Sequence, residues 1–345
     1  MLPSESIVYS WVKSYVLPAS LLLMILALDV PGILRLGPRA VIMLLAGTAG
    51  VVIGGPIALL ITHAWLPDDA WRGMAALSGS WIGGGANMLA LKEMFKAGDG
   101  IFSAMVVVDV LVANIWMGVL LYAAGAHRRI DAATGADSSA VDELERRTTE
   151  FQRKNARIAS LPELLTILAI GFLGSWLGFA SGDLLAAWVG GLDAAVWKYI
   201  WITAVGIVLS FTPARRLEGA GASRVGSVMI YLLVACIGAT GDFRKLTDSP
   251  ALLAMGLIWM AVHVTVLLTT AKLIRAPVFF VAVGSQANIG GAASAPVVAS
   301  AFHPSLAPVG VLLAVAGYVL GTYAGILCAV LLAWAAGQDP WAVVP

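Results

Sequence analysis

Charged side chains are scarce in this 345-residue sequence, where Asp, Glu, Lys and Arg make up 12% of the residues. Soluble domains carry about 25%, whereas the hydrophobic share here is 60% and the mean hydropathy is +0.90. This composition predicts an integral membrane protein, because lipid is as apolar as the side chains that face it. The formal net charge of +1, with no basic cluster interleaved with aromatics, argues against a nucleic-acid partner.

Cysteine is almost absent, and the two that occur, Cys236 and Cys328, lie in apolar segments. We therefore interpret both as packing residues rather than as redox groups or metal ligands. The sequence contains no His-Glu-x-x-His, Gly-x-Ser-x-Gly, Walker lysine or Cys/His metal spacing, so no enzyme is predicted. The first apolar segment lacks a basic flank and a small-residue cleavage site, which favours a membrane span over a signal peptide.

Long apolar runs dominate the rest of the sequence. Segments of about 20 apolar residues can cross a bilayer as helices, and such spans are predicted at 7–28, 40–62, 101–124, 161–180, 196–212, 225–241, 250–271 and 306–335. Two further apolar stretches, 72–95 and 277–301, are rich in helix-breaking residues, namely Gly83-Gly84-Gly85, Gly284-Ser285-Gln286, Gly290-Gly291 and Pro296. Glycine costs about 1 kcal/mol in a helix interior and proline about 3 kcal/mol. Each stretch is therefore expected to form two half-helices around an unwound turn.

The positions of Lys and Arg predict the orientation of the spans, because these residues mark the cytoplasmic side. The longest polar segment, 125–160, carries near-balanced charge and is interpreted as a solvated cytoplasmic linker. If both broken stretches are hairpins that enter and leave on one side, all basic connections are cytoplasmic. If both cross the membrane fully, Arg35 and Arg39 move outside. The pattern favours hairpins, with unwound crossing helices as the alternative, in a multi-pass protein of the inner membrane.

An internal repeat is indicated by two similar segments. Pro18–Leu36 and Met229–Leu246 each run apolar to an aspartate and then to a basic residue, and each precedes a long span, a broken stretch and another long span. The broken stretches share Gly-x-x-Ala-Asn, ending at Asn87 and Asn288. An odd number of crossings between the copies predicts opposite orientations, as in inverted-repeat transporters. The alternative is that these glycines only permit close helix packing.

Candidate binding residues concentrate at the breaks. Unwound backbone at membrane depth survives only where it faces protein, water or a ligand, and half-helix ends offer N–H groups to anions and carbonyls to cations. Asp109 lies among valines, where an isolated carboxylate costs about 2.5–3.5 kcal/mol, which indicates an ion or proton site or else a cap on a neighbouring half-helix. The predicted substrate- and ion-binding residues are Gly84, Gly85, Asn87, Asp109, Asn114, Ser285, Gln286, Asn288 and Gly290.

A sodium ion is the possible metal, because hard cations prefer oxygen ligands of the kind that Asn87, Asp109 and Asn288 carry. The sequence leaves Na⁺ coordination and H⁺ coupling at Asp109 open, and no other cofactor is predicted. His263 lies inside the span 250–271 and is interpreted as hydrogen-bonded across helices rather than as a ligand.

The stretches 79–87, 284–292, 301–310 and 317–323 resemble the domain of unknown function 819 family of membrane proteins (YjcL-like). The resemblance covers most of the chain and is strongest over 277–330. It implies a repeat plan similar to that of the glutamate–sodium, 2-hydroxycarboxylate and bile-acid–sodium symporters, and thus an elevator-type carrier that forms a homodimer. It also implies extra N-terminal helices before the counterpart of Pro18, so we expect either that the chain is truncated or that its first half is shorter here.

Together these observations predict an all-α integral membrane fold, an inverted-topology repeat transporter with two broken or re-entrant helical hairpins. The expected parts are a first repeat at 1–124, a cytoplasmic linker at 125–160 and a second repeat at 161–345, with a transport unit of 72–124 plus 277–335 and a scaffold of 7–62 plus 161–271. The predicted function is secondary active transport of a small polar or anionic organic solute in the lipid bilayer, coupled to Na⁺ or H⁺. The alternatives are a passive channel and a non-transporting membrane scaffold or receptor.

Overall fold

The computed structural model describes residues 11–26, 28, 30–136, 141, 143, 146, 159–189, 194–226, 228–229, 232, 250–303 and 306–341. Over these residues the chain is helical and contains no strand. Five of the helices are long and apolar enough to cross a membrane, or six if α10, which bends by 90° into a short 3₁₀ segment, is counted with that segment as one span. The predicted integral membrane class agrees with this architecture.

The elements follow one another in an order close to that predicted. They are a π-helical turn Val12–Val16, α2 Leu17–Leu26, α3 Val30–Arg35, α4 Pro38–Thr62, α5 Ala70–Met94, α6 Asp99–Gly125, α7 His127–Thr134, α9 Leu161–Val189, α10 Ala194–Ser210, the 3₁₀ segment Pro213–Ala220, α13 Pro250–Ile274, α14 Val278–Ile289, α15 Gly291–Phe302 and α16 Ala307–Ala335. Most of the predicted span 225–241, most of the linker and both aspartates of the sequence repeat, Asp29 and Asp242, lie outside the described residues.

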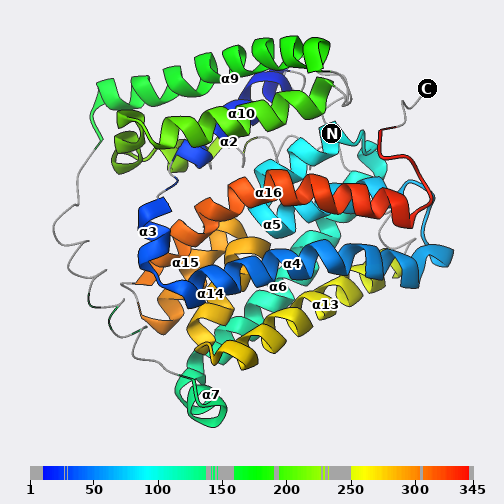
Figure 1. The fold of residues 1–345 in the computed structure, drawn as a ribbon, viewed down its shortest axis with the longest axis vertical. Coiled ribbons are helices and arrows are strands. Elements are labelled where there is room, and N and C mark those ends of the chain that lie inside the picture. Colours follow the sequence, from blue (N-terminus) through cyan, green and yellow to red (C-terminus); the bar gives the residue numbers. More distant parts are fainter. Residues whose placement is uncertain are drawn as a thin grey trace.

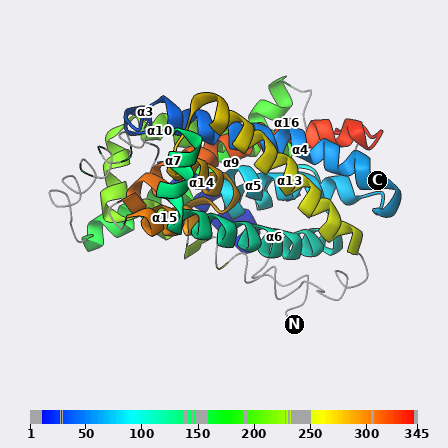
Figure 2. The same cartoon turned by 90° about the horizontal axis from the view of Figure 1, so that it is seen from below.

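The helices form two layers. Helices α9 and α10 lie together along one side with α2 beneath them, and the remaining long helices form a larger body below (Figure 1). Seen from below, α6 runs along one edge of that body and α13 runs obliquely across it toward one end of α6 (Figure 2). Helix α2 lies between the two layers, where it contacts α9 and α10 on one side and α5 and α16 on the other. Its residues Leu21, Leu22 and Leu23 are fully buried. Since all ten residues of α2 are buried, this short apolar helix is held by packing on every side.

The outer faces of the long helices are apolar. On α9, large side chains such as Leu173, Trp176 and Trp188 are 59–85% exposed, and on α6 Leu111, Ile115 and Tyr122 are also exposed. In water such a surface would be unfavourable, whereas lipid tails solvate it at no cost. The burial pattern therefore supports the membrane environment that the composition predicts.

The first broken stretch is a hairpin. Helix α5 is interrupted at Gly83 (φ −143°, ψ 15°) and Gly84 (φ 76°, ψ −177°). The ring of Trp71 at its start lies 6.4 Å from the ring of Phe95 just beyond its end, and Arg72 Nη1 donates to the Phe95 carbonyl at 2.6 Å. A straight helix would separate those ends by about 36 Å. The chain therefore turns back at the glycines, so that α5 consists of two arms.

The second broken stretch folds back in the same way. Helices α14 and α15 meet at Gly291, whose φ is 57°. The rings of Phe279, near the start of α14, and Phe302, the last residue of α15, pack edge to face with centroids 5.3 Å apart. Both broken stretches thus bring their open ends together, as the hairpin interpretation of the charge pattern requires.

The position of the second break differs from the shared Ala-Asn pattern. Gly284-Ser285-Gln286 continues as α-helix, and the chain breaks only at Gly290-Gly291, after Asn288. Gly284 stays helical because its bare surface packs against α4, where an added Cβ would lie 3.1 Å from Met43. When the left-handed glycines Gly84 and Gly291 are aligned, Asn87 matches Ser294. The prediction that both breaks end in Ala-Asn was therefore wrong for the second half.

Close backbone contact between α15 and α16 yields a stability prediction. A Cβ at Gly310 would lie 2.5 Å from the Ala295 carbonyl oxygen, which is backbone that cannot rotate away. Gly310→Ala is expected to lower the free energy of unfolding by about 1–3 kcal/mol. The matched control is Gly118→Ala in α6, where nothing lies within 4 Å of the added methyl. Thermal unfolding in detergent checks both, and equal midpoints for the two variants would contradict the packing.

Candidate functional site

The tips of the two hairpins touch inside the larger body. A Cβ at Gly291 would lie 3.6 Å from Gly84 Cα. A Cβ on either glycine would also lie within 4 Å of Tyr318 Cε1 of α16. Both glycines have positive φ, a conformation that other residues rarely adopt. Gly84 and Gly291 are buried, whereas the neighbouring Gly85 and Gly290 are partly exposed. The tips therefore lie within the bundle but beside a route to its surface.

Asn87 joins the first hairpin to α16. Its Nδ2 donates to the carbonyls of Gly83 at 3.0 Å and Tyr318 at 2.9 Å, and its Oδ1 accepts from Thr322 Oγ1 at 2.7 Å. The side chain is fully buried. Both amide hydrogens and one lone pair of the oxygen are thus used within the protein.

Asn288 joins the second hairpin to α4 by the same set of bonds. Its Nδ2 donates to the carbonyls of Gly284 and Leu44, both at 2.9 Å, and its Oδ1 accepts from Thr48 Oγ1 at 2.8 Å. Like Asn87, it is fully buried. In this conformation each asparagine holds a hairpin arm against a long helix.

Asp109 of α6 contacts the first hairpin. Ser80 Oγ donates to its Oδ2 at 2.7 Å and Trp81 Nε1 donates to its Oδ1 at 2.8 Å, so both carboxylate oxygens have partners. Asp109 is partly exposed as a residue, and its partners Ser80 and Trp81 lie in the arm that leads to the tip glycines. Asn114 lies further along α6, is exposed and donates to its own helix at Val110. The structure therefore does not bring Asn114 to the hairpins.

A hydrogen-bond chain links Ser285 to three helices. Trp116 Nε1 of α6 donates to Ser285 Oγ at 2.8 Å, and Ser285 Oγ lies 2.8 Å from His263 Nε2 of α13. His263 Nδ1 lies 3.0 Å from the Gly47 carbonyl of α4, which can only accept. We therefore place the hydrogen on Nδ1, which leaves Nε2 to accept from the serine hydroxyl. His263 is a bridge across helices, as expected from the sequence.

Gln286 lies inside the second hairpin, where its Nε2 donates to Ser294 Oγ of α15 at 2.7 Å. The side chain is 1% exposed. No group of three or more His, Cys, Asp or Glu side chains lies close enough to hold a metal within the described part of the chain. A cation at the tips would therefore rely on neutral oxygens.

Sequence reasoning missed Thr48, Thr322, Tyr318 and Ser294. One signal for the threonines was present, because Gly47-Thr48 and Gly321-Thr322 are the same dipeptide in two different spans. The glycine in each pair lets the asparagine approach, since a Cβ at Gly47 would lie 2.6 Å from Asn288 Nδ2 and one at Gly321 2.5 Å from Asn87 Nδ2. Which asparagine pairs with which threonine could not be read from the sequence.

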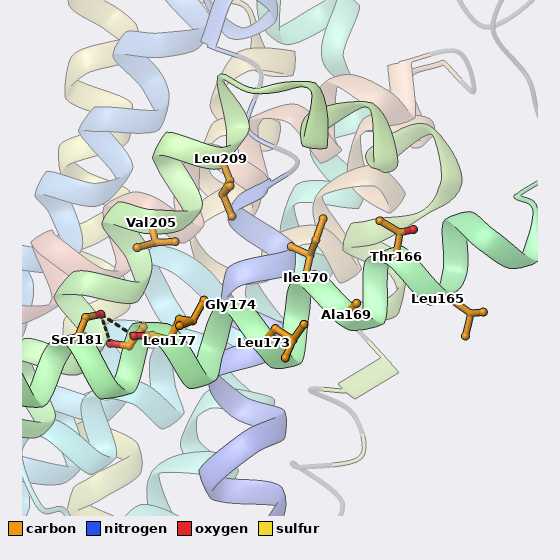
Figure 3. A pocket seen from close by; sticks show the side chains of 11 residues that line it. Leu165, Thr166, Ala169, Ile170, Leu173, Gly174, Leu177, Ser181, Val205 and Leu209 are labelled. Atoms are coloured by element: carbon orange, nitrogen blue, oxygen red, sulfur yellow. Dashed lines mark hydrogen bonds between the residues drawn. The ribbon is translucent and has the colours of Figure 1, made fainter.

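An apolar groove runs along the other layer, lined by α9 and α10 residues that include Leu165, Leu173, Leu177, Val205 and Leu209 (Figure 3). Its polar side chains, Thr166 and Ser181, both bond to carbonyls of their own helix. A lipid tail suits this lining better than a polar solute does. We therefore place the candidate site at the hairpin tips and not in the groove.

Comparison with known proteins decides the family. The family described as "Protein of unknown function (DUF819)" matches residues 1–334. The chain belongs to the DUF819 family. A relative within the curated proteins is "Uncharacterized membrane protein YjcL" of Bacillus subtilis (strain 168), which is 26% identical over 341 residues, covering 94% of this chain and 84% of the relative. The resemblance inferred from the glycine-rich stretches is thus confirmed, and the DUF819 hairpins described above lie within the matched region.

The buried Asn87 and the exposed Asn114 give a stability prediction with a matched control. Asn87→Ala removes the donor to the Gly83 and Tyr318 carbonyls, and we expect it to lower the free energy of unfolding by about 1–3 kcal/mol, because buried acceptors are left unpaired. Asn114→Ala, at an exposed position, is expected to change it by less than about 0.5 kcal/mol. Denaturation followed by tryptophan fluorescence measures both, and a similar loss in the two variants would refute the structural role of Asn87.

Proposed function

We propose that this DUF819 protein is a secondary active transporter that moves a small polar or anionic organic solute by alternating access, coupled to Na⁺ or H⁺. The observation that carries the proposal is the contact between the two hairpin tips at Gly84 and Gly291. Interrupted helices that meet within a bundle are typical of carriers that bind their solute there. Each tip joins the carbonyl end of one arm to the N–H end of the next, so it offers partial charges of both signs.

The side-chain bonds support a moving unit larger than the one inferred from the sequence. Asn288 ties the second hairpin to α4, and Ser285 ties it through His263 to α13. If the hairpins move, α4 and α13 must move with them or these buried bonds must break. We therefore propose that α4–α6 and α13–α16 move as one body.

The opposing scaffold is then α2, α9 and α10. Helix α2 packs on α9 and α10 and also touches α5 and α16, and all ten of its residues are buried, nine of them apolar. Apolar surfaces can slide past one another without breaking hydrogen bonds. A polar contact across the boundary is that between Thr203 Oγ1 of α10 and Thr322 Oγ1 of α16, at 3.1 Å. Thr322 also donates to Asn87 of the first hairpin. We therefore expect the distance between Thr203 and Thr322 to change when that hairpin moves relative to α10.

We further propose that the protein lies in the inner membrane as a homodimer, with the 125–160 linker in the cytoplasm. The charge pattern between the spans supports the orientation, and the large apolar side chains exposed on α9 are suited to a second copy or to lipid.

The orientation can be checked by labelling at the start of the linker. Thr134 at the end of α7 is exposed. In a Cys236→Ser, Cys328→Ser background, Thr134→Cys is expected to react with a membrane-impermeant maleimide only after the cells are opened. Labelling of intact cells would overturn the cytoplasmic assignment.

Transport is tested by counterflow. Organic acids, amino acids and nucleosides are first screened for an increase in the unfolding temperature, because a ligand of the folded state stabilises it by mass action. A stabilising solute is then loaded into proteoliposomes, and uptake of the labelled solute is expected to be faster than into empty vesicles. A passive channel gives no such acceleration, and a non-transporting scaffold gives no uptake.

Counterflow also tests the hairpin tips. Gly84→Ala and Gly291→Ala force a side chain into left-handed backbone, so we expect each to lower the exchange rate at least tenfold relative to the unchanged protein. Gly98→Ala is the control, because Gly98 has φ −61° and nothing within 4 Å of an added methyl. Full exchange in both tip variants would exclude the tips as the moving site.

A further inference from the structure

One buried oxygen in the second hairpin lacks a partner. Gln286 donates through Nε2 to Ser294, while its Oε1 is the buried side-chain atom for which the described part of the chain supplies no hydrogen-bond partner. Buried polar atoms are normally satisfied, by protein, by ordered water or by an ion. An amide oxygen accepts hydrogen bonds and coordinates cations, so the missing partner is a donor or a cation.

The space around Gln286 limits the size of that partner. The turn at Gly290 covers the side chain, and a Cβ there would lie 2.5 Å from Gln286 Nε2 and would collide with Ser294 Oγ. Gln286 itself is 1% exposed, and the tip glycines Gly84 and Gly291 are in contact beside it. An organic solute does not fit between these groups. The candidate partner is therefore no larger than a single ion or a water molecule, and the adjacent Gly290 is partly exposed.

The chemistry around Gln286 favours a cation of low charge. Gln286 lies in the last turn of α14, where the helix dipole contributes partial negative charge through carbonyls that have no N–H group beyond them. Ser294 Oγ keeps a lone pair after accepting from Gln286. Divalent cations are usually held by carboxylates, but the carboxylate of Asp109, which contacts the first hairpin at Ser80 and Trp81, already accepts a hydrogen bond on each oxygen.

We propose that Gln286 Oε1 and Ser294 Oγ bind a monovalent inorganic cation at the tip of the second hairpin. Such an ion would bridge α14 and α15 directly behind Gly291 and so fix the tip that faces Gly84. The inference rests on the proposed function for its purpose, since ion binding at the tip would couple the ion to the solute. The sequence placed the cation at Asn87, Asp109 and Asn288, but the polar groups of these residues hold helices together. The proposed site is instead Gln286 and Ser294, where the Gln286 Oε1 has no hydrogen-bond partner in the described part of the chain.

The experiment is a cation titration of the purified full-length protein in detergent, with the unfolding temperature read from tryptophan fluorescence. NaCl, LiCl and KCl are each compared with choline chloride at constant ionic strength. At least one of these cations is expected to raise the unfolding temperature in a saturable way relative to choline. Gln286→Met, which keeps the length of the side chain and removes the oxygen, is expected to abolish the rise. Gln286→Glu, which adds a charge to the site, is expected to lower the half-maximal cation concentration several-fold.

The matched control is Gln338→Met, since Gln338 is exposed beyond α16 and should leave the titration unchanged. If Gln286→Met fails to fold, Ser294→Ala serves instead and should raise the half-maximal cation concentration. An unfolding temperature that is the same in all four salts would overturn the proposal and point to bound water. So would an unchanged titration in the folded Gln286→Met variant, or in Ser294→Ala where that serves in its place. Because no transport is measured, a protein that binds the cation but shows no counterflow would retain this site and lose only the proposed function.

Discussion

The structure depends on how interrupted backbone is satisfied in an apolar environment. A broken helix leaves carbonyls and N–H groups without their helical partners, and lipid offers none. At the first hairpin Asn87 meets this need, because it donates to the Gly83 carbonyl at the break and to the Tyr318 carbonyl of α16. Asn288 makes the same kind of bonds from the unbroken part of α14, to the carbonyls of Gly284 and of Leu44 in α4. In both cases a threonine hydroxyl from the same long helix donates to the amide oxygen of the asparagine. The hairpins are therefore held where they are by a few directional bonds, and not by apolar packing alone.

These bonds also determine which helices can act as a unit. Buried or partly buried side-chain hydrogen bonds connect the second hairpin to α4, α6 and α13 and the first hairpin to α6 and α16. Toward α10 the printed side-chain hydrogen bond is that between Thr203 and Thr322, whereas α2, α9 and α10 pack on one another through leucine and glycine, for example Leu22 against Gly174 and Gly206. Hydrogen-bonded contacts resist displacement, whereas contacts between smooth apolar surfaces do not. This distribution of polar side chains is the basis for the proposal that α4–α6 and α13–α16 move as one body relative to α2, α9 and α10.

The polar residues near the tips differ in what they have left to offer a ligand. Asp109 is the most conspicuous in the sequence because of its charge, yet both of its oxygens already accept hydrogen bonds. Gln286, one of several neutral residues that the sequence suggested, holds a buried oxygen with no partner in the described part of the chain. In a medium of low polarity an unsatisfied neutral oxygen points to a ligand as directly as a charge does. The proposed cation site is therefore assigned to the amide and not to the carboxylate.

Local features of the chain were enough to place it in the membrane, to locate most of its helices and to identify two stretches that could not be single helices. Apolar run length, glycine and proline act over a few residues, so their consequences are visible without a fold. The register of the second break was not visible, because Gly284 stays helical only by packing against α4. Nor were the partners of the asparagines, since Thr48 and Asn288 are 240 residues apart. Contacts of that kind arise only when the helices are assembled, and it is they that make two glycine-rich stretches into one candidate site.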